Sequence, residues 1–178
     1  MASKLDRLCC LALVVAPLYE NRLKQNQRFF MAYWILKTEP NTYSIEDLQK
    51  DKETDWDGVR NYQARNFIKQ MQAQDLAFFY HSNCKVPGIV GIMQICGPAI
   101  PDLTALNSSS QYFDPRSTVE QPRWYMVKVK FVEKFPNIIP LSLLKATKNL
   151  AKLPLLQRGN RLSIMPVTSK EWQAILKL

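Results

Sequence analysis

Five short apolar segments, separated by turn-forming and polar residues, constrain the fold more than any other feature of this chain. Runs of four to eight residues rich in aromatic and β-branched side chains are typical of buried strands. In the fourth segment apolar and polar side chains alternate, which indicates a longer strand with one buried face. The five segments are Tyr33–Leu36, Leu76–His81, Ile89–Cys96, Arg123–Lys134 and Arg161–Val167.

Capping signals place short helices between these strands. Ser44 followed by Asp47 is typical of a capping box, although Glu or Gln would be the stronger partner. Asn61 precedes apolar residues at helical spacing, so a helix is expected over residues 61–72. Further helices are expected at residues 141–147, at residues 153–157 and after Thr168 or Ser169.

Two connecting segments stand out by their composition. Residues 51–57 are polar and are expected to form a loop. Residues 97–122 are rich in Pro, Ser, Asn and Asp, and a loop of that length is usually functional or partly disordered. Five or six strands with short intervening helices predict an α+β domain built on a curved or closed sheet.

The charge balance indicates the kind of partner. The 178 residues are enough for one domain with a buried core. The formal net charge of +9 favours a polyanionic partner, with nucleic acid first and an anionic membrane surface second. Simple solubility would account for the same charge, so charge alone does not decide.

Cysteine and histidine are too sparse for a metal centre. The four cysteines have no CxxC spacing and the chain has one histidine, so we expect no metal and no cofactor. Cys84 and Cys96 flank a predicted strand and are expected to be free buried thiols. This pattern favours a reducing compartment.

Residues 1–30 differ from the rest of the chain. Lys4 and Arg7 precede the apolar run Leu8–Leu18, which resembles the start of a signal peptide but lacks a clear cleavage site. The run is too short to span a bilayer comfortably. We expect a disordered leader or one outside the natural start, with Met31 opening a domain over residues 31–178. A leader that docks as an amphipathic helix is the alternative.

The segment from Asp55 to Phe67 holds the densest group of recognition chemistry. It places aromatic, arginine and amide side chains around one glycine, which suits a planar hydrogen-bonding ligand such as a nucleobase. The simpler interpretation is a helix start with Asn61 as N-cap and solvated arginines. Trp56 lies in polar surroundings without core periodicity, so we expect it to be exposed or semi-exposed and to stack on a flat ligand.

Motifs of common enzyme classes are missing from the sequence. It contains no GxGxxG, no P-loop and no GxSxG. His81 as a base with Ser82 or Cys84 as nucleophile would need an orienting third group, and none is indicated. A lone histidine at a strand end is as often a structural hydrogen-bonding group, so both roles stay open. Trp124, Trp172 and Phe79 are expected in the core.

Several ordered segments together resemble the EVE domain, a member of the PUA-like superfamily that also contains the YTH readers. The resemblance runs from about Met31 to the C-terminus and leaves residues 1–30 outside. The segments that carry it are Tyr33–Pro40, Trp56–Phe67, Phe79–Asn83, Pro87–Gly91, Tyr112–Pro115, Pro122–Trp124, Arg161–Ser163 and Pro166–Val167.

The resemblance implies a PUA-like fold, with a mixed, barrel-like sheet of five to six strands surrounded by helices. It also implies a non-enzymatic reader that holds a flipped modified base of the 5-methylcytosine or 5-hydroxymethylcytosine class. The implied rim residues, which would contact the nucleic-acid backbone, are Arg60, Arg65 and Lys85. The implied pocket residues are Trp34, Lys37, Trp56, Arg60, Asn61, Tyr80, His81, Ser82, Asn83, Ser163 and Pro166.

Two other functions remain open from the sequence. One is an RNA-binding accessory module that recognises shape without a modified base. The other is an enzyme on a nucleotide or small ligand that uses His81 with Tyr80 or Ser82. The expected partner is modified DNA or RNA and not a membrane. We expect a monomer, located in the cytoplasm of a bacterium or in the nucleus of a eukaryote.

Overall fold

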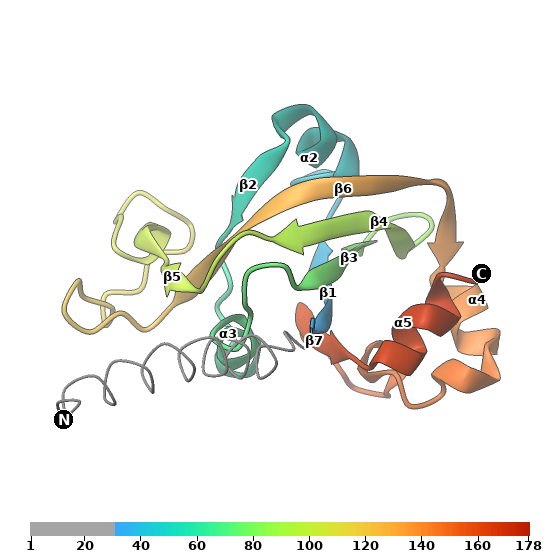
Figure 1. Ribbon diagram of the computed structural model, residues 1–178. Helices are drawn as coiled ribbons and strands as arrows, with labels where there is room; N and C mark the ends of the chain where they lie inside the picture. The colour runs from blue at the N-terminus through green and yellow to red at the C-terminus, as the bar shows by residue number, and fades with distance from the viewer. Residues whose placement is uncertain (1–30) are drawn as a thin grey trace, which may run out of the picture. The chain divides into compact units, whose positions relative to one another are not determined.

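The strands form one mixed sheet in the computed structural model, which describes residues 31–178. The order across the sheet is β2-β6-β4-β3-β1-β7, and the short β5 pairs with β6 (Figure 1). The sheet is curved but open, with β2 and β7 at its ends. The strands are β1 (Tyr33–Thr38), β2 (Glu53–Trp56), β3 (Leu76–His81), β4 (Gly88–Ile95), β5 (Ile100–Pro101), β6 (Tyr125–Pro140) and β7 (Ile164–Val167).

Pairing at the centre of the sheet is both parallel and antiparallel. β1 runs parallel to β3, with Tyr33 opposite Leu76, and antiparallel to β7. β3 and β4 pair antiparallel with a register shift between Phe79 and Tyr80, and β4 and β6 show two further shifts. Such bulges bend strands and increase their twist, which accounts for the curvature of the sheet.

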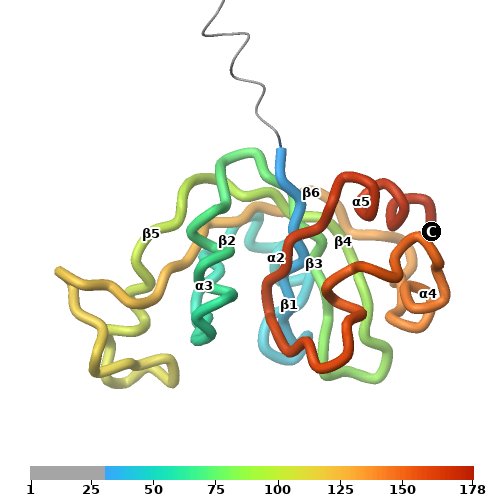
Figure 2. The backbone as a smooth tube through the Cα atoms, turned by 90° about the horizontal axis from the view of Figure 1, so that it is seen from below, coloured from blue at the N-terminus to red at the C-terminus, as the bar shows by residue number. Residues whose placement is uncertain are grey.

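Helices cover both faces of the sheet. α2 (Ile45–Asp51) begins with the predicted capping box of Ser44 and Asp47, and α3 (Tyr62–Ile68) begins with Asn61 as N-cap. α4 (Leu141–Ala146) follows β6 directly, and α5 (Ser169–Ile175) begins with a second capping box, Thr168 with Glu171. Figure 2 shows α3 beside the segment that carries β5, and α4 and α5 at the other end of the domain.

Strand alternation divides the core into two clusters. Trp34 and Leu36 of β1 pack with α2 and α3, whereas Ile35 between them packs with α4 and α5. Phe78 stacks on Trp172 of α5 with ring centroids 3.9 Å apart. Trp124, Trp172 and Phe79 are buried, as predicted.

The expectation of a polar loop over residues 51–57 is wrong, because this segment contains β2. Its outward carboxylates pair with β6, since Lys128 lies 3.7 Å from Glu53 and 3.3 Å from Asp55. Trp56 is the inward residue of this polar strand and is only 8% exposed, which contradicts the expected exposed side chain. The outward positions of β2 are charged because they pair with β6, so the sequence of this strand does not show an apolar and polar alternation typical of a strand.

Other boundaries also differ from the predicted ones. The β6 strand extends to Pro140 instead of ending at Lys134, and the described strands number seven. α3 ends at Ile68 rather than at residue 72, because the chain then turns around the buried Asp75, whose carboxylate accepts the backbone N–H of Gln72 and Ala32. Residues 97–122 include β5 and a 3-10 turn, Leu103–Ala105, fixed by buried Asp102.

Cys84 and Cys96 are free thiols, as predicted, but both are half-buried instead of buried. None of the helices within residues 31–178 has the length and apolar character needed to cross a membrane. The expected leader lies outside the described residues.

Candidate nucleic-acid base site

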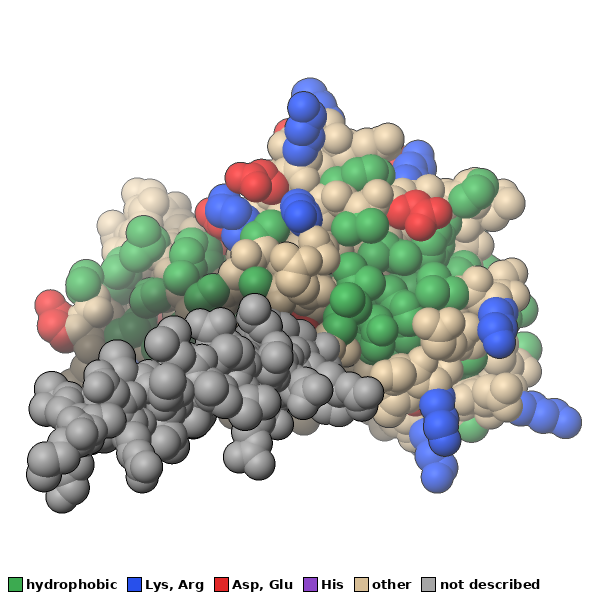
Figure 3. All heavy atoms as spheres, viewed as in Figure 1, with side chains coloured by type: hydrophobic (Ala, Val, Ile, Leu, Met, Phe, Trp, Pro, Cys, Tyr) green, Lys and Arg blue, Asp and Glu red, His purple; other side chains and the backbone are tan. Residues whose placement is uncertain are grey.

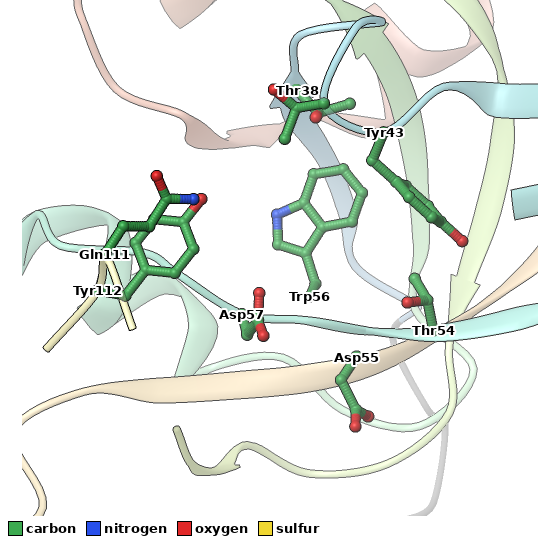
Figure 4. A pocket seen from close by; sticks show the side chains of 9 residues that line it. Thr38, Tyr43, Thr54, Asp55, Trp56, Asp57, Gln111 and Tyr112 are labelled. Atoms are coloured by element: carbon green, nitrogen blue, oxygen red, sulfur yellow. The ribbon is translucent and has the colours of Figure 1, made fainter. Parts of the chain in front are cut away.

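A polar hollow of about 350 Å³ opens where β2 ends. Figure 4 shows Trp56 in the middle of its lining side chains, with Gln111 and Tyr112 to one side and Tyr43 to the other. A volume of this size is at the small end of the range for small-molecule sites. The lining residues are Thr38, Thr42, Tyr43, Thr54, Asp55, Trp56, Asp57, Gln111 and Tyr112.

The indole of Trp56 is held by the core and presents only a small part to the hollow. Its ring meets Phe79 edge-on, at 5.5 Å between centroids and 86° between planes. No side-chain or backbone acceptor among residues 31–178 binds its Nε1–H. Since no buried side-chain nitrogen of these residues lacks a partner, this nitrogen is accessible to solvent. In Figure 4 the nitrogen points toward the side where Tyr112 lies, so the hollow contains a hydrogen-bond donor.

The carboxylate of Asp57 supplies acceptors at the same place. Desolvation raises the pKa of Asp57, nearby Asp102 and Asp55 raise it further, and Arg60 lowers it in part. Asp55 is compensated by Lys128 on β6. No lysine or arginine lines the hollow in the described part of the chain, so its chemistry suits an amine donor rather than a phosphate.

Arg60 fixes the wall that Tyr112 forms. Its guanidinium donates to the Tyr112 carbonyl at 2.7 Å, to Asp102 Oδ2 at 2.7 Å and to Thr104 Oγ1 at 3.0 Å. It also lies 5.4 Å from the Tyr112 ring centroid. Arg60 was predicted to be a rim residue for the nucleic-acid backbone; in the structure its charge is already paired with the Asp102 carboxylate.

Asp102 and Gly58 complete this arrangement. Burial alone would raise the pKa of Asp102, but hydrogen bonds from Thr104, Arg60 and the Gly58 N–H hold it below its usual value. Gly58 has φ +69°, and a Cβ there would lie 2.7 Å from the Tyr112 ring. Glycine is therefore required both for the backbone conformation and for the close approach of the tyrosine.

His81 occupies a structural position in α2 packing. Its Nε2 accepts the backbone N–H of Ile45 at 3.2 Å, so this nitrogen carries no proton. Burial lowers the pKa of His81, and Lys134 adds to this effect while Glu46 opposes it. His81 does not line the hollow.

Two predicted aromatic site residues also serve the core. Trp34 is buried and donates from Nε1 to Asp75 at 3.0 Å. Tyr80 is buried in the cluster with α4 and α5, and burial raises its pKa to about 12. Lys37 lies 6.0 Å from the Tyr80 ring, and burial lowers the pKa of its ammonium.

The other predicted residues lie around the strand ends, away from the hollow. Ser82 Oγ donates to the Thr38 carbonyl, and Ser163 accepts the backbone N–H of Lys37. Asn61 caps α3 through Gln63 and Ala64. Asn83 has φ +50°, Pro166 pairs with Trp34, and Lys85 lies by a groove beside α4. Of the predicted pocket residues, Trp56 alone lines the hollow.

Most of the lining residues are not among the residues predicted from the sequence. Thr38 is the last residue of β1, and Tyr43 directly precedes Ser44, the N-cap of α2. Gln111 and Tyr112 lie in the long irregular segment, whose length was the available signal. Asp55 and Asp57 flank Trp56, and in the sequence they predict only polar surroundings for it.

A second concavity has different chemistry. A groove of about 490 Å³ lies between the last part of β6, α4 and the C-terminal residues that follow α5. Figure 3 shows hydrophobic side chains gathered on the face that carries β4 and α5. The apolar lining residues of the groove are Phe135, Ile138, Ile139, Leu143, Leu176 and Leu178. Residues 31–178 contain no cluster of three or more side chains suited to hold a metal ion.

The curved mixed sheet with its flanking helices is the fold of an EVE-type domain. The EVE domain model matches residues 32–178, and the chain belongs to this family. Mouse thymocyte nuclear protein 1 is 46% identical over 164 residues, which covers 82% of this chain and 73% of the mouse protein. The human protein of that name is 43% identical over 165 residues, which covers 83% of this chain and 73% of the human protein.

Solved structures of relatives share the fold. A Pseudomonas syringae protein superposes with a TM-score of 0.80 at 50% identity, covering 82% of this chain and 98% of that one. The human THYN1 protein, solved in complex with DNA containing 5-methylcytosine, superposes with a TM-score of 0.78. It is 41% identical, and the match covers 82% of this chain and 96% of the human chain.

Proposed function

We propose that this protein is a non-enzymatic reader of DNA that takes one flipped base of the 5-methylcytosine or 5-hydroxymethylcytosine class into the hollow beside Trp56. The complex of the human relative with 5-methylcytosine DNA supports the choice of ligand. The size of the hollow, about 350 Å³, suits one small ligand. Flipping costs a few kcal/mol, which contacts in the pocket must offset.

The observation that carries the proposal is the pairing of a donor with acceptors in one small hollow. Trp56 offers its Nε1–H, and Asp57 offers carboxylate oxygens. Cytosine has the complementary edge, with an amino donor at N4 and acceptors at O2 and N3. A bidentate contact of this kind contributes about 1–3 kcal/mol of discrimination.

The modification itself contributes less. Burying one methyl group is worth about 0.8 kcal/mol, which corresponds to roughly fourfold in affinity. We therefore expect a strong preference for the cytosine edge and a modest preference for its methylated form. The tyrosine wall at Tyr112 supplies a second aromatic surface for the flat base.

The two alternatives have weaker support. An enzyme that uses His81 would need its imidazole at the hollow, whereas Nε2 is bonded to the Ile45 N–H elsewhere. An RNA accessory module would not need a hollow that complements a single base. Competition between methylated DNA and structured RNA separates the RNA function from the proposed one.

The experiment is a binding titration with two substitutions at Trp56. Trp56→Phe keeps an aromatic ring but removes the N–H, and Trp56→Ala removes both. Fluorescence anisotropy with duplexes that carry a central 5-methylcytosine or cytosine is measured across a salt series. We expect both variants to lose base-dependent affinity, with Trp56→Ala weaker. Equal affinity of the wild type for the two duplexes at every salt concentration would reject the methylated-base claim.

A matched control uses the same change elsewhere. Trp172→Phe alters a buried indole in the cluster on the other face of the sheet. It removes an indole N–H without touching the hollow, and we expect the preference for 5-methylcytosine over cytosine to stay that of the wild type.

A further inference from the structure

We propose that the exposed face of α3 holds the DNA strand beside the flipped base, with Tyr62 as a stacking surface and Arg65 as a phosphate contact. This inference rests on the proposed function for its partner. Tyr62 is 46% exposed although its ring is large and partly apolar. An exposed aromatic that is held rigidly suits stacking on a nucleic-acid base.

The ring of Tyr62 is supported by the buried Trp124. Its ring stacks on Trp124 with centroids 5.0 Å apart and 26° between planes. Trp124 is buried and donates from Nε1 to Asp114 at 2.8 Å. The tyrosine ring therefore has one face on the protein core side while much of the residue stays in solvent.

Two guanidinium groups lie over the same ring. Arg65 lies 4.9 Å and Arg123 lies 5.7 Å from the Tyr62 centroid, and Arg123 also donates to the Tyr62 hydroxyl. Arg123 lies 3.6 Å from Asp114 and is partly compensated. Arg65 bonds to the Arg123 carbonyl and to Asn66, and no carboxylate pairs with it within residues 31–178. Its charge is thus available to a phosphate.

The spacing along α3 extends the basic surface. Tyr62, Arg65 and Lys69 follow one another at three and four residues, which places them on one face of the helix. Lys69 lies at the end of α3 with its ammonium 4.7 Å from the Tyr125 ring. Basic residues interleaved with aromatic ones are the arrangement that binds a nucleic-acid strand.

Arg60 links this surface to the hollow. Its guanidinium lies 5.4 Å from the ring of Tyr112, which lines the hollow, and 5.5 Å from the ring of Trp124, which supports Tyr62. The path from Tyr112 through Arg60 and Trp124 to Tyr62 consists of three such distances. Together they are shorter than half a helical turn of DNA, whose full turn is about 34–36 Å. One duplex can therefore reach both places.

The test compares variants that keep the hollow intact. Arg65→Gln removes the charge at α3, and Arg158→Gln removes a more exposed arginine from the loop before β7. Binding to a duplex with a central 5-methylcytosine is measured against salt concentration. We expect Arg65→Gln to reduce the slope of log K against log salt by about 0.9, the value for one phosphate contact. Arg158→Gln should leave the slope unchanged.

The stacking claim has its own variant. Tyr62→Ala should weaken binding about fivefold or more, since an aromatic stack contributes at that level. Tyr62→Phe keeps the ring and should bind nearly as the wild type. If Tyr62→Ala lowers the melting temperature, the Arg65→Gln slope still decides the claim.

Failure of this proposal and failure of the base-reader function give different results. Both α3 variants should weaken methylated and unmethylated DNA equally, because they do not touch the hollow. If the wild type shows no base preference but Arg65→Gln still reduces the slope, the reader function fails and this surface stands. A slope for Arg65→Gln equal to that of the wild type overturns it. The proposal is also overturned if Arg65→Gln changes the salt dependence of binding to an RNA hairpin or to anionic vesicles but not to DNA.

Discussion

The guanidinium of Arg60 donates to the backbone carbonyl of Tyr112 at 2.7 Å. This contact connects the long segment after β5 to the residues that follow the end of β2. The same guanidinium pairs with Asp102, whose side chain is fully buried. The position of one wall of the hollow therefore depends on a charge outside it.

Replacement of Arg60 should damage stability and the site together. In Arg60→Met the carboxylate of Asp102 stays buried without its partner, which we expect to cost about 3 kcal/mol. Urea denaturation measures the loss. In Asp102→Asn the charge is removed from the other side, and we expect a smaller loss because no carboxylate is left unpaired. Equal stability of Arg60→Met and the wild type would contradict the role of this ion pair.

Two glycines form a matched pair for testing the Tyr112 wall. Gly58 and Gly159 both have positive φ, but a Cβ at Gly58 meets the Tyr112 ring at 2.7 Å and one at Gly159 meets nothing within 4 Å. Each alanine substitution costs about 1 kcal/mol for the backbone conformation. Gly58→Ala should cost more and weaken binding of methylated DNA, whereas Gly159→Ala should leave binding unchanged. Thermal unfolding and anisotropy measure both effects.

The only histidine of the chain predicts a pH dependence of stability. Burial holds the pKa of folded His81 below the ordinary value of about 6.5. The unfolded state therefore takes up a proton first as the pH falls, and stability decreases below about pH 6.5 until the folded pKa is passed. The slope is at most about 1.4 kcal/mol per pH unit.

Denaturation curves at pH 7 and pH 5.5 measure this effect. His81→Gln keeps an acceptor for the Ile45 N–H but does not titrate, so its stability should change less over the same range. A wild type and a variant that lose equal stability between these pH values would rule out His81 as the cause.

Asp57 should make binding of the base sensitive to pH. Its pKa is raised by desolvation, with contributions from Asp102 and Asp55, so it takes up a proton at a higher pH than an ordinary aspartate. If the ionised carboxylate accepts the cytosine amine, affinity should fall as the pH is lowered toward that pKa. Asp57→Asn should bind more weakly at pH 7.5 and show a smaller decrease on acidification. Glu120→Gln removes one exposed carboxylate outside the hollow, so its affinity should depend on pH as that of the wild type does.

Much of the fold follows from local patterns in the sequence. The β3 strand and both caps, at Ser44 and at Thr168, were predictable because they depend on neighbouring residues alone. β2 was not, because its outward residues are charged and its pairing depends on Lys128, more than seventy positions away. Patterns within one segment do not reveal such long-range compensation.

The site was less predictable than the fold. Trp56 was identified from its polar surroundings, and it does line the hollow. Tyr112 is not among the predicted site residues, because only the tertiary contacts of Arg60 and Gly58 bring it to the hollow. Trp34 and Tyr80 share the aromatic character of a binding residue, but strand alternation directs both into the core. Residue type alone does not separate these two uses.

The central claim is that Asp57 and Trp56 read the amino edge of a cytosine, and thymine tests it most directly. Thymine keeps the 5-methyl group but has a carbonyl in place of the N4 amine. Affinities are compared for duplexes that differ only in a central 5-methylcytosine or thymine, for the wild type and for Asp57→Asn. The account predicts that the wild type prefers 5-methylcytosine at least about fivefold and that Asp57→Asn loses most of this preference. Equal binding of the two duplexes by the wild type would contradict it.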